Sequence, residues 1–559
     1  MKLATIKQAG GRRAALVVDH PLDGSPWAVP AGGTETPVGW DLAYRTAREL
    51  LRESRGELDH LRRAEHAWQA MLGGGTDDTA AIAVPLAYEQ LLPPIPDPPL
   101  IFGLVGNNAA FVRADHTRAR NLQLPAGHAR PPRSFIGPGD AVRVPPGASR
   151  CSATTELGIV IGRAARNVAI ADAMRYVAGY TIVNDLVVDC YTQNARTSHS
   201  QHDINTPTGF HIANAASWLD KSVDSMCSIG PWIVTCDEIP DPYDLLVSFK
   251  ANDTRLDRAY SGTLLAGVEQ LVSWASHLFP LQPGAILHLG AMGRDGIPTD
   301  LDVLRREGVV RIESEIEQIG VLANVVTSSV SAPSLRAPDV LAEEVDDRRS
   351  LWVILGNSPH GATYHNLCDG RSLIAYNTPA SALAADHARV SIPIPPEQLA
   401  IAAELAVIID QPIRNATADE VRARLRGYSL MLSLHDETMA TALLSPHRLP
   451  RNMPAIYARW HKQFNVLGEP LSSIDPRLSI TCVVDGRKSE SAELAGYAKT
   501  ADVAIAELST YITLWPGDVV TLGILTKPIN LGLVSTNDVE IKVEAFVPDG
   551  PAVSAALVL

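Results

Sequence analysis

Short runs of hydrophobic residues, broken by Gly, Pro and Asp, recur along most of this chain and are typical of β-strands. Between residues 100 and 326 these runs are Leu100–Val105, Leu157–Ile161, Pro231–Thr235, Leu245–Phe249, Ala285–Leu289 and Val309–Ile312. Two segments with helical spacing, 169–177 and 263–276, lie between them. The pattern predicts a β-rich α+β architecture with a mixed or antiparallel sheet.

The first 98 residues carry a different pattern. A short apolar run, Ala14–Asp19, predicts a strand, and the spacing of Ala, Leu and Trp over 41–71 predicts an amphipathic helix that ends before the glycines at 73–75. The proline-rich stretch 92–99 is typical of an extended linker, because proline fixes φ and lacks a backbone donor. Residues 1–98 are therefore expected to form a small α/β leader domain.

Three landmarks occur twice, in the same order: Glu156–Gly162 and Glu404–Asp410, Gly179-Tyr180 and Gly427-Tyr428, Leu281–Gly284 and Leu514–Gly517. The first two pairs are offset by 248 residues (404 minus 156, 428 minus 180) and the third by 233 (517 minus 284). Because three landmarks keep their order and internal spacing, they predict an internal duplication. We place the copies at 99–330 and 351–559, separated by a polar, acidic linker.

Length and charge narrow the classes of protein. A chain of 559 residues exceeds what one hydrophobic core usually supports, and the formal net charge of -14 argues against a nucleic acid or an anionic membrane as partner. No uninterrupted apolar run of about 18 residues exists to span a bilayer, and the N-terminus lacks the apolar core of a signal peptide. The six cysteines are scattered, so we expect reduced thiols in a soluble, cytoplasmic protein.

Five motifs, taken together, resemble the fumarylacetoacetate hydrolase family: Phe135–Asp140, Glu156–Gly162, Gly179–Asp185, Lys221 with Gly230–Trp232, and Leu281–Gly284. The doubled arrangement is similar to that of the two-copy decarboxylase/isomerase of homoprotocatechuate degradation in that family. The resemblance implies two mixed-sheet domains, each partly rolled into a barrel, that form a pseudo-dimer within one chain. It also implies a site for a divalent cation, Mg²⁺ or another, that acts on 2-oxo acids or 1,3-dicarbonyl compounds.

The family's cation is held by a Glu-x-Glu pair and an Asp, and the matching positions here are Thr154, Glu156 and Asp185. A further acidic ligand of the family falls at Asn108 or Ala109, so two of the carboxylates are replaced. Glu156 and Asp185 either hold a divalent cation that keeps several waters or are satisfied by local hydrogen bonds. The sequence leaves both alternatives open.

The second copy departs further from the family pattern. Its matching positions are Ala402, Glu404 and Ser433, so no metal is expected there. This copy is expected to act as scaffold and pseudo-dimer partner, or to contain a differently built pocket. Three of its histidines form either a metal-free acid/base site or ordinary polar loops: His360, His365 and His435.

Other catalytic and binding residues follow from the resemblance. His116 is the predicted base, since an imidazole with a pKa near neutrality suits proton abstraction beside a carbonyl. Lys221 matches the family lysine that contacts substrate oxygens. The predicted substrate-binding residues are Asn108, Arg113 and Arg196, and the last of these lies where the family has a mobile lid.

These observations support an enzyme that cleaves, decarboxylates or isomerises an enolisable 2-oxo acid or 1,3-dicarbonyl compound. One alternative is a metal-independent cyclase or tautomerase of a specialised pathway, because two family carboxylates are replaced. Another is a catalytically inactive binding protein. In each case the expected partner is a small molecule, and the sequence leaves open whether two chains pair further.

Overall fold

The computed structural model describes residues 1–8, 11–31, 44–74, 83–108, 126–132, 134–145, 147–193, 218–293, 299–301, 309–328, 349–365, 373–392, 394, 398–437, 459–531, 540–548 and 550–558. These residues form two compact units, treated separately below. The first takes the described residues of Met1–Ala119, Pro125–Val188 and Ser225–Arg348. The second takes those of Asp189–Asp224 and Arg349–Leu559. The predicted acidic linker lies largely outside the described part.

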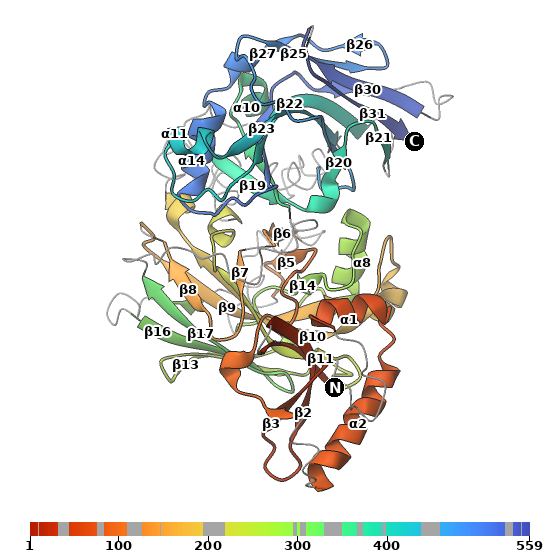
Figure 1. Cartoon of the computed structure of the whole chain (residues 1–559), viewed down its shortest axis with the longest axis vertical. Helices are drawn as coiled ribbons and strands as arrows, with labels where there is room; N and C mark the ends of the chain where they lie inside the picture. Colours follow the sequence, from red (N-terminus) through yellow and green to blue (C-terminus); the bar gives the residue numbers. More distant parts are fainter. Residues whose placement is uncertain are drawn as a thin grey trace. The chain divides into compact units, whose positions relative to one another are not determined.

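A mixed sheet of twelve strands dominates the first unit (Figure 1). Its path runs β4-β3-β2-β1-β11-β10-β9-β14-β5-β6. Along that path lie β4 (Val84–Pro85), β3 (Pro26–Pro30), β2 (Gly11–Asp19), β1 (Lys2–Gln8), β11 (Cys227–Thr235), β10 (Val177–Val188), β9 (Cys151–Ile161), β14 (Ile286–His288), β5 (Ile101–Val105) and β6 (Ala126–Arg130). Two short strands join from the side, β7 (Phe135–Ile136) on β11 and β15 (Thr299–Asp300) on β9. The β14–β5 pair is parallel and the β14–β9 pair antiparallel, so the predicted mixed sheet is confirmed.

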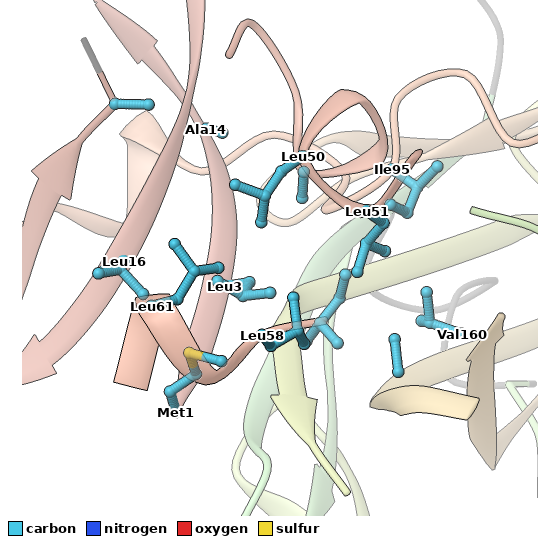
Figure 2. Packing of buried hydrophobic residues seen from close by; sticks show 14 of the residues in the cluster. Met1, Leu3, Ala14, Leu16, Leu50, Leu51, Leu58, Leu61, Ile95 and Val160 are labelled. Carbon is cyan, nitrogen blue, oxygen red and sulfur yellow. The ribbon is translucent and has the colours of Figure 1, made fainter. Parts of the chain in front are cut away.

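The leader is part of this sheet. Strand β1 pairs with β11, and one buried cluster joins leader residues such as Leu3 and Leu50 to Val160 of β9 (Figure 2). The leader's two helices, α1 (Ala47–Glu53) and α2 (Asp59–Gly74), belong to the same compact unit. The predicted boundary near residue 98 therefore separates two stretches of sequence that share one hydrophobic core.

The single helix predicted over 41–71 is wrong in its middle. Helix α1 ends at Glu53 and α2 begins at Asp59. Between them Arg55 and Gly56 both have positive φ, 51° and 72°. This left-handed conformation ends a helix, and the apolar spacing continues across it because both helices face the same core.

The remaining elements of the first unit form a smaller sheet and short helices. A five-stranded sheet has the order β13 (Thr254–Tyr260), β12 (Leu246–Ala251), β16 (Val309–Ile316), β17 (Gly320–Ser328) and β8 (Ala141–Val144). The helix predicted over 169–177 is the 3₁₀ helix η2 (Ile170–Tyr176), and the one predicted over 263–276 is α8 (Val268–Leu278), which begins after Gly267.

The second unit contains two sheets. An eight-stranded sheet has the path β19 (Ile374–Thr378), β18 (Leu351–Leu355), β28 (Val519–Ile524), β22 (Leu399–Ile409), β23 (Leu425–Asp436), β24 (Asn465–Leu467) and β20 (Leu383–Ala385), with β29 (Ile529–Asn530) on β22. A six-stranded sheet contains β21 (Ala388–Ser391), β31 (Ala552–Val558), β30 (Glu540–Phe546), β25 (Ser479–Val484), β26 (Arg487–Lys488) and β27 (Ala492–Glu493). Its described helices include α10 (Pro359–His365), α11 (Ala418–Arg422) and α14 (Ala501–Ser509). Among the described residues of the whole chain, no helix combines the length and apolar character needed to cross a bilayer.

The duplication is visible in the strand order. The first unit contains the neighbours β10-β9-β14-β5 and the second contains β23-β22-β28-β18. The registers also match, because Thr154 lies opposite Asp185 and Ala402 lies opposite Ser433, each pair displaced by the same 248 residues (402 minus 154, 433 minus 185). The same strand order and register therefore occur in both units.

The described residues 189–193 and 218–224 belong to the second unit, although the predicted boundaries place them in the first copy. Their end is fixed there because Asp224 accepts hydrogen bonds from the backbone N–H (3.2 Å) and the hydroxyl (2.5 Å) of Thr513. The rings of Tyr191 and Tyr511 also lie together, with centroids 4.1 Å apart.

Candidate functional site

Three predicted site residues lie outside the described part of the chain: Arg113, His116 and Arg196. Asn108 follows β5 and is fully buried. Its amide donates hydrogen bonds to the carbonyl oxygens of Ala291 (3.1 Å) and Gly293 (3.2 Å). The amide therefore anchors the loop after β14, and its contact with a substrate stays a prediction.

Lys221 is buried, with 7% of its surface exposed, and belongs to the second unit. Its neighbour Asp220 accepts hydrogen bonds from the backbone N–H groups of Tyr191 (2.7 Å) and Thr192 (3.0 Å). Burial raises the pKa of Asp220 to about 7, although these hydrogen bonds oppose the shift. The role of Lys221 in holding a substrate oxygen stays a prediction.

Glu156 and Asp185, the predicted metal ligands, are buried on the neighbouring strands β9 and β10. Alternation along β9 puts Thr154 on the same face as Glu156, and strand register places Thr154 opposite Asp185. Asp185 forms an ion pair with the guanidinium of Arg130, and Glu156 contacts Nδ1 of His288. Each carboxylate thus has a basic partner, from β6 and β14 respectively.

The sheet is strongly curled at this point. Strands β6 and β10 are four places apart along the sheet, which would separate them by about 19 Å if the sheet were flat. Nevertheless Nε2 of His128, on β6, lies 3.8 Å from Oδ1 of Asp185, on β10. Two such side chains cannot bridge a flat sheet over that distance, so the sheet rolls around the cluster, as the predicted partial barrel requires.

A cross-strand row places the two histidines beside each other. His128 and His288 both pair with Gly103, from opposite sides of β5, and we call His128, Gly103 and His288 the site row. A Cβ on Gly103 would lie only 1.8 Å from Cε1 of His288. The absence of a side chain at Gly103 therefore leaves space for the two rings, whose centroids lie 5.5 Å apart in an edge-to-face arrangement.

The donors of this cluster fit a divalent cation. One ligand atom each from His128, Asp185 and His288 lies within 4.8 Å of the others, and all three residues are buried. Imidazole nitrogens and a carboxylate oxygen are established ligands of divalent metals. Burial lowers the pKa of the neighbouring Arg130 guanidinium. Counted with full charges, Glu156, Asp185 and Arg130 together give the site a net charge of about -1.

The second unit has a different row at the corresponding place. Tyr376 and Thr521 both pair with Val353 across β18, so Tyr376, Val353 and Thr521 stand where the first unit has His, Gly and His. The hydroxyl of Thr521 contacts a carboxylate oxygen of Glu404, as His288 contacts Glu156 in the first unit. The fold is repeated here, but the imidazole donors are not.

An arginine neutralises the retained carboxylate of the second unit. Arg459 binds Glu404 through two nitrogens, at 2.7 and 3.2 Å, and both side chains are almost completely buried. The same guanidinium donates to the side-chain oxygen of Asn465 at 3.0 and 2.7 Å. Glu404 is therefore satisfied by fixed protein groups, and the absence of a metal from this copy stays a prediction.

The three histidines noted in the second copy have different surroundings. The side chain of His365 lies outside the described part, and His360 is half-buried on α10. His435 is fully buried on β23, with Nε2 3.1 Å from the hydroxyl of Ser433. His435 is therefore a strand residue within a polar cluster and not part of a loop.

Sequence reasoning missed three members of the first site: His128, Arg130 and His288. The only available signal was a polar residue within an otherwise apolar run, as in the predicted strand Ala285–Leu289, whose one polar member is His288. Such a pattern indicates burial of a polar group with a partner, but it does not name the partner.

Comparison with protein-family models identifies the family. The fumarylacetoacetate (FAA) hydrolase C-terminal model matches residues 101–327 and again 362–549. The chain belongs to the FAA hydrolase family. Both units carry the family domain, so the tandem arrangement predicted from the repeat is confirmed. In this FAA hydrolase chain the row His128, Gly103 and His288 of the first copy corresponds to Tyr376, Val353 and Thr521 in the second.

Named relatives of this FAA hydrolase family protein are enzymes. It is 28% identical over 247 residues to the mitochondrial oxaloacetate tautomerase Fahd2a of Rattus norvegicus, which covers 44% of this chain and 71% of that protein. It is 32% identical over 179 residues to 2,4-didehydro-3-deoxy-L-rhamnonate hydrolase of Sphingomonas sp., over 32% of this chain and 56% of that enzyme. The chain thus spans between about half and three quarters of these relatives.

Among solved structures, the FAA hydrolase chain is similar to maleylpyruvate hydrolase from Sphingobium sp. SYK-6. The sequence identity is 24%, the TM-score is 0.41, and the match covers 59% of this chain and all of that one.

Proposed function

We propose that the first unit contains an enzyme site that enolises a 2-oxo acid by moving a proton beside its keto group. The observation that carries this proposal is the buried cluster of two imidazoles, two carboxylates and one guanidinium built by four strands of a rolled sheet. The names of the relatives support it, because oxaloacetate tautomerases interconvert the keto and enol forms of a 2-oxo acid.

The chemistry needs no co-reactant. A base removes a proton from the carbon beside the keto group, the electron pair moves to the keto oxygen, and that oxygen takes up a proton to give the enol. A divalent cation held by His128, Asp185 and His288 would supply positive charge to the keto and carboxylate oxygens and so stabilise the enolate. The predicted base is His116.

Two described residues of the site fix the orientation of the proposed metal ligands. Glu156 fixes the ring of His288 through Nδ1, and Arg130 fixes the carboxylate of Asp185. The rolled sheet keeps both pairs away from water, which strengthens electrostatic interactions inside the site. A site prepared in this way does not need to reorganise while the enolate forms.

The test uses oxaloacetate. The purified protein should accelerate enol–keto conversion, measured by the decay of enol absorbance, and should exchange the C3 protons in D₂O, measured by NMR. His288→Gln should lower kcat/KM by about 100-fold or more, while His387→Asn, a change at an exposed histidine on a turn, should leave it unchanged. Conversion at the buffer rate by the wild-type protein would contradict the proposal.

A metal-free form of the same reaction is the second candidate. The ion pair between Arg130 and Asp185 favours it, because a buried guanidinium already supplies a fixed positive charge beside the carboxylates. Rates that persist after exhaustive treatment with EDTA would support this candidate. Rates that vanish with EDTA and return with added metal would support the cation.

A further inference from the structure

The residue that contacts Glu156 changes what this carboxylate can do. In the family pattern the Glu at this position binds the cation directly, whereas here it contacts Nδ1 of His288. We propose that His128, Asp185 and His288 bind a transition metal such as Zn²⁺, Co²⁺ or Fe²⁺ in preference to Mg²⁺, and that Glu156 acts as the positioning residue of His288. This inference rests on the cation of the proposed function and deepens it.

The type of donor carries the first step. Two of the three converging groups, His128 and His288, are imidazoles. Imidazole nitrogen suits zinc, iron and related transition metals, whereas Mg²⁺ prefers oxygen ligands and retains several waters. A site that replaces two carboxylates by two imidazoles therefore loses the ligands that Mg²⁺ needs.

The hydrogen bond behind His288 carries the second step. Histidines that bind metals almost always present their other ring nitrogen to a carboxylate or carbonyl, which fixes the tautomer and the ring orientation. Glu156 stands in that position at Nδ1, so Nε2 is the ring nitrogen that would bind the cation. The second carboxylate, Asp185, is in turn held by Arg130.

The charge of the site points the same way. The family pattern of a Glu-x-Glu pair, an Asp and a further acidic ligand has four negative charges, whereas Glu156 and Asp185 with Arg130 give about -1 when fully ionised. The lower charge weakens the attraction for a hard cation that is bound mainly by electrostatics. A borderline metal loses less, because its bonds to nitrogen do not depend on the net charge alone.

The site row shows that strand β5 leaves room for the imidazoles, because its central residue is a glycine. His288 occupies space that any side chain at residue 103 would fill, and His128 faces the same glycine from the other side. In the second unit the corresponding row is Tyr376, Val353 and Thr521, and Arg459 neutralises Glu404. We therefore expect one transition metal per chain.

The decisive experiment measures metal binding without substrate. The full-length protein is stripped of metal and titrated with Co²⁺, followed by its visible absorption, and with Zn²⁺ and Mg²⁺ by calorimetry. We expect one Co²⁺ or Zn²⁺ per chain and no displacement of Co²⁺ by a large excess of Mg²⁺. Glu156→Gln should weaken Co²⁺ binding by about 10- to 100-fold, and His128→Asn should weaken it further.

The control is His387→Asn, which removes an exposed histidine beside Asp386 and should not change the affinity. Residue 387 has a φ of 60°, a conformation that Asn tolerates, so the variant should fold. Circular dichroism checks the fold of each variant. If His128→Asn does not fold, the metal preference of the wild type and the Glu156→Gln titration decide.

Mg²⁺ that competes with Co²⁺ at similar concentration, or Glu156→Gln with unchanged Co²⁺ affinity, would overturn the inference. Two metals per chain would overturn the assignment to the first unit alone. The result is independent of turnover: absence of oxaloacetate conversion with this metal preference intact refutes the proposed function and leaves the metal site standing.

Discussion

The family carboxylates retained in the two units, Glu156, Asp185 and Glu404, each contact a basic side chain. In the second unit the carboxylate of Glu404 accepts hydrogen bonds from two nitrogens of Arg459, and both side chains are almost inaccessible to water. Removing one member of such a pair costs more than the pair itself contributes, because the other charge remains buried without compensation. The arginine therefore has a structural role that a surface ion pair does not have.

Arg459→Met should lower the free energy of unfolding by about 3–5 kcal/mol, since the buried Glu404 loses its counter-charge. Urea denaturation followed by circular dichroism measures the change. The matched control is Arg477→Ala, which breaks an exposed ion pair with Asp475 and should leave the transition midpoint almost unchanged. Equal effects of the two variants would contradict the structural role of Arg459.

Individual residues show how far the sequence could predict the site. Glu156 and Asp185 were found because they stand in motifs that resemble those of the family. His128 and His288 were missed because their proximity depends on which strands are neighbours and on how tightly the sheet curls, and neither follows from local spacing. Arg130 was missed for the same reason.

Strand pairing turns a single glycine into a requirement of the site. Gly103 is in the middle of β5, where a glycine usually weakens a strand because it has no side chain to pack. Here the absence of a side chain leaves space for the ring of His288. Residues on β5, β6 and β14 therefore have to be read as one group and not strand by strand.

Gly103→Ala should displace the ring of His288, because the new Cβ would overlap it. We expect Co²⁺ affinity to fall by about 10- to 100-fold, as for the loss of a residue that positions a ligand. Gly496→Ala is the control, since a Cβ there would meet only Leu525 at an ordinary 3.7 Å. Unchanged Co²⁺ binding by a folded Gly103→Ala protein would show that His288 is not a ligand.

The sequence predicts an element well where an apolar run has clear turn residues at its ends, and it misses a break that consists of only a few residues. The predicted strand Leu157–Ile161 lies within β9, because it is a continuous apolar run bounded by turn residues. Strand β10, which carries Asp185, was not among the predicted strands. The break between α1 and α2 was missed, since the left-handed conformation at Arg55 and Gly56 interrupts the backbone without interrupting the apolar spacing.

Across the whole molecule, the duplication could be recognised from the chain alone, but the exchange of a segment could not. The described residues 189–193 and 218–224 follow β10 of the first copy in the chain and belong to the second compact unit. Sequence order does not report such an exchange, because it depends on contacts with residues such as Thr513, almost 300 positions further on. The domain boundaries 99–330 and 351–559 therefore stay a proposal about sequence repeats.

Asp220 gives this segment a dependence on pH. Its folded pKa of about 7 lies above the ordinary 3.8, so between these values the folded protein holds a proton that the unfolded chain has released. Stability from this group is thus full at low pH and is lost as pH rises towards about 7, by at most about 1.4 kcal/mol per pH unit. Urea denaturation across this range should show that the free energy of unfolding of the wild type falls relative to that of Asp220→Asn as pH rises. A constant difference would contradict the raised pKa.

The two rows also constrain how one copy could be converted into the other. A histidine at position 288 requires a glycine at position 103, whereas the valine at the matching position 353 is compatible with a threonine at 521. A change of either residue alone therefore produces a clash or a gap, so the order of mutations matters, and the glycine has to come first at a cost in strand stability. Because His128 also stands where the other row has Tyr376, conversion of one row into the other takes three substitutions, and a variant that carries only the glycine has a weakened strand without the histidines that the glycine makes room for.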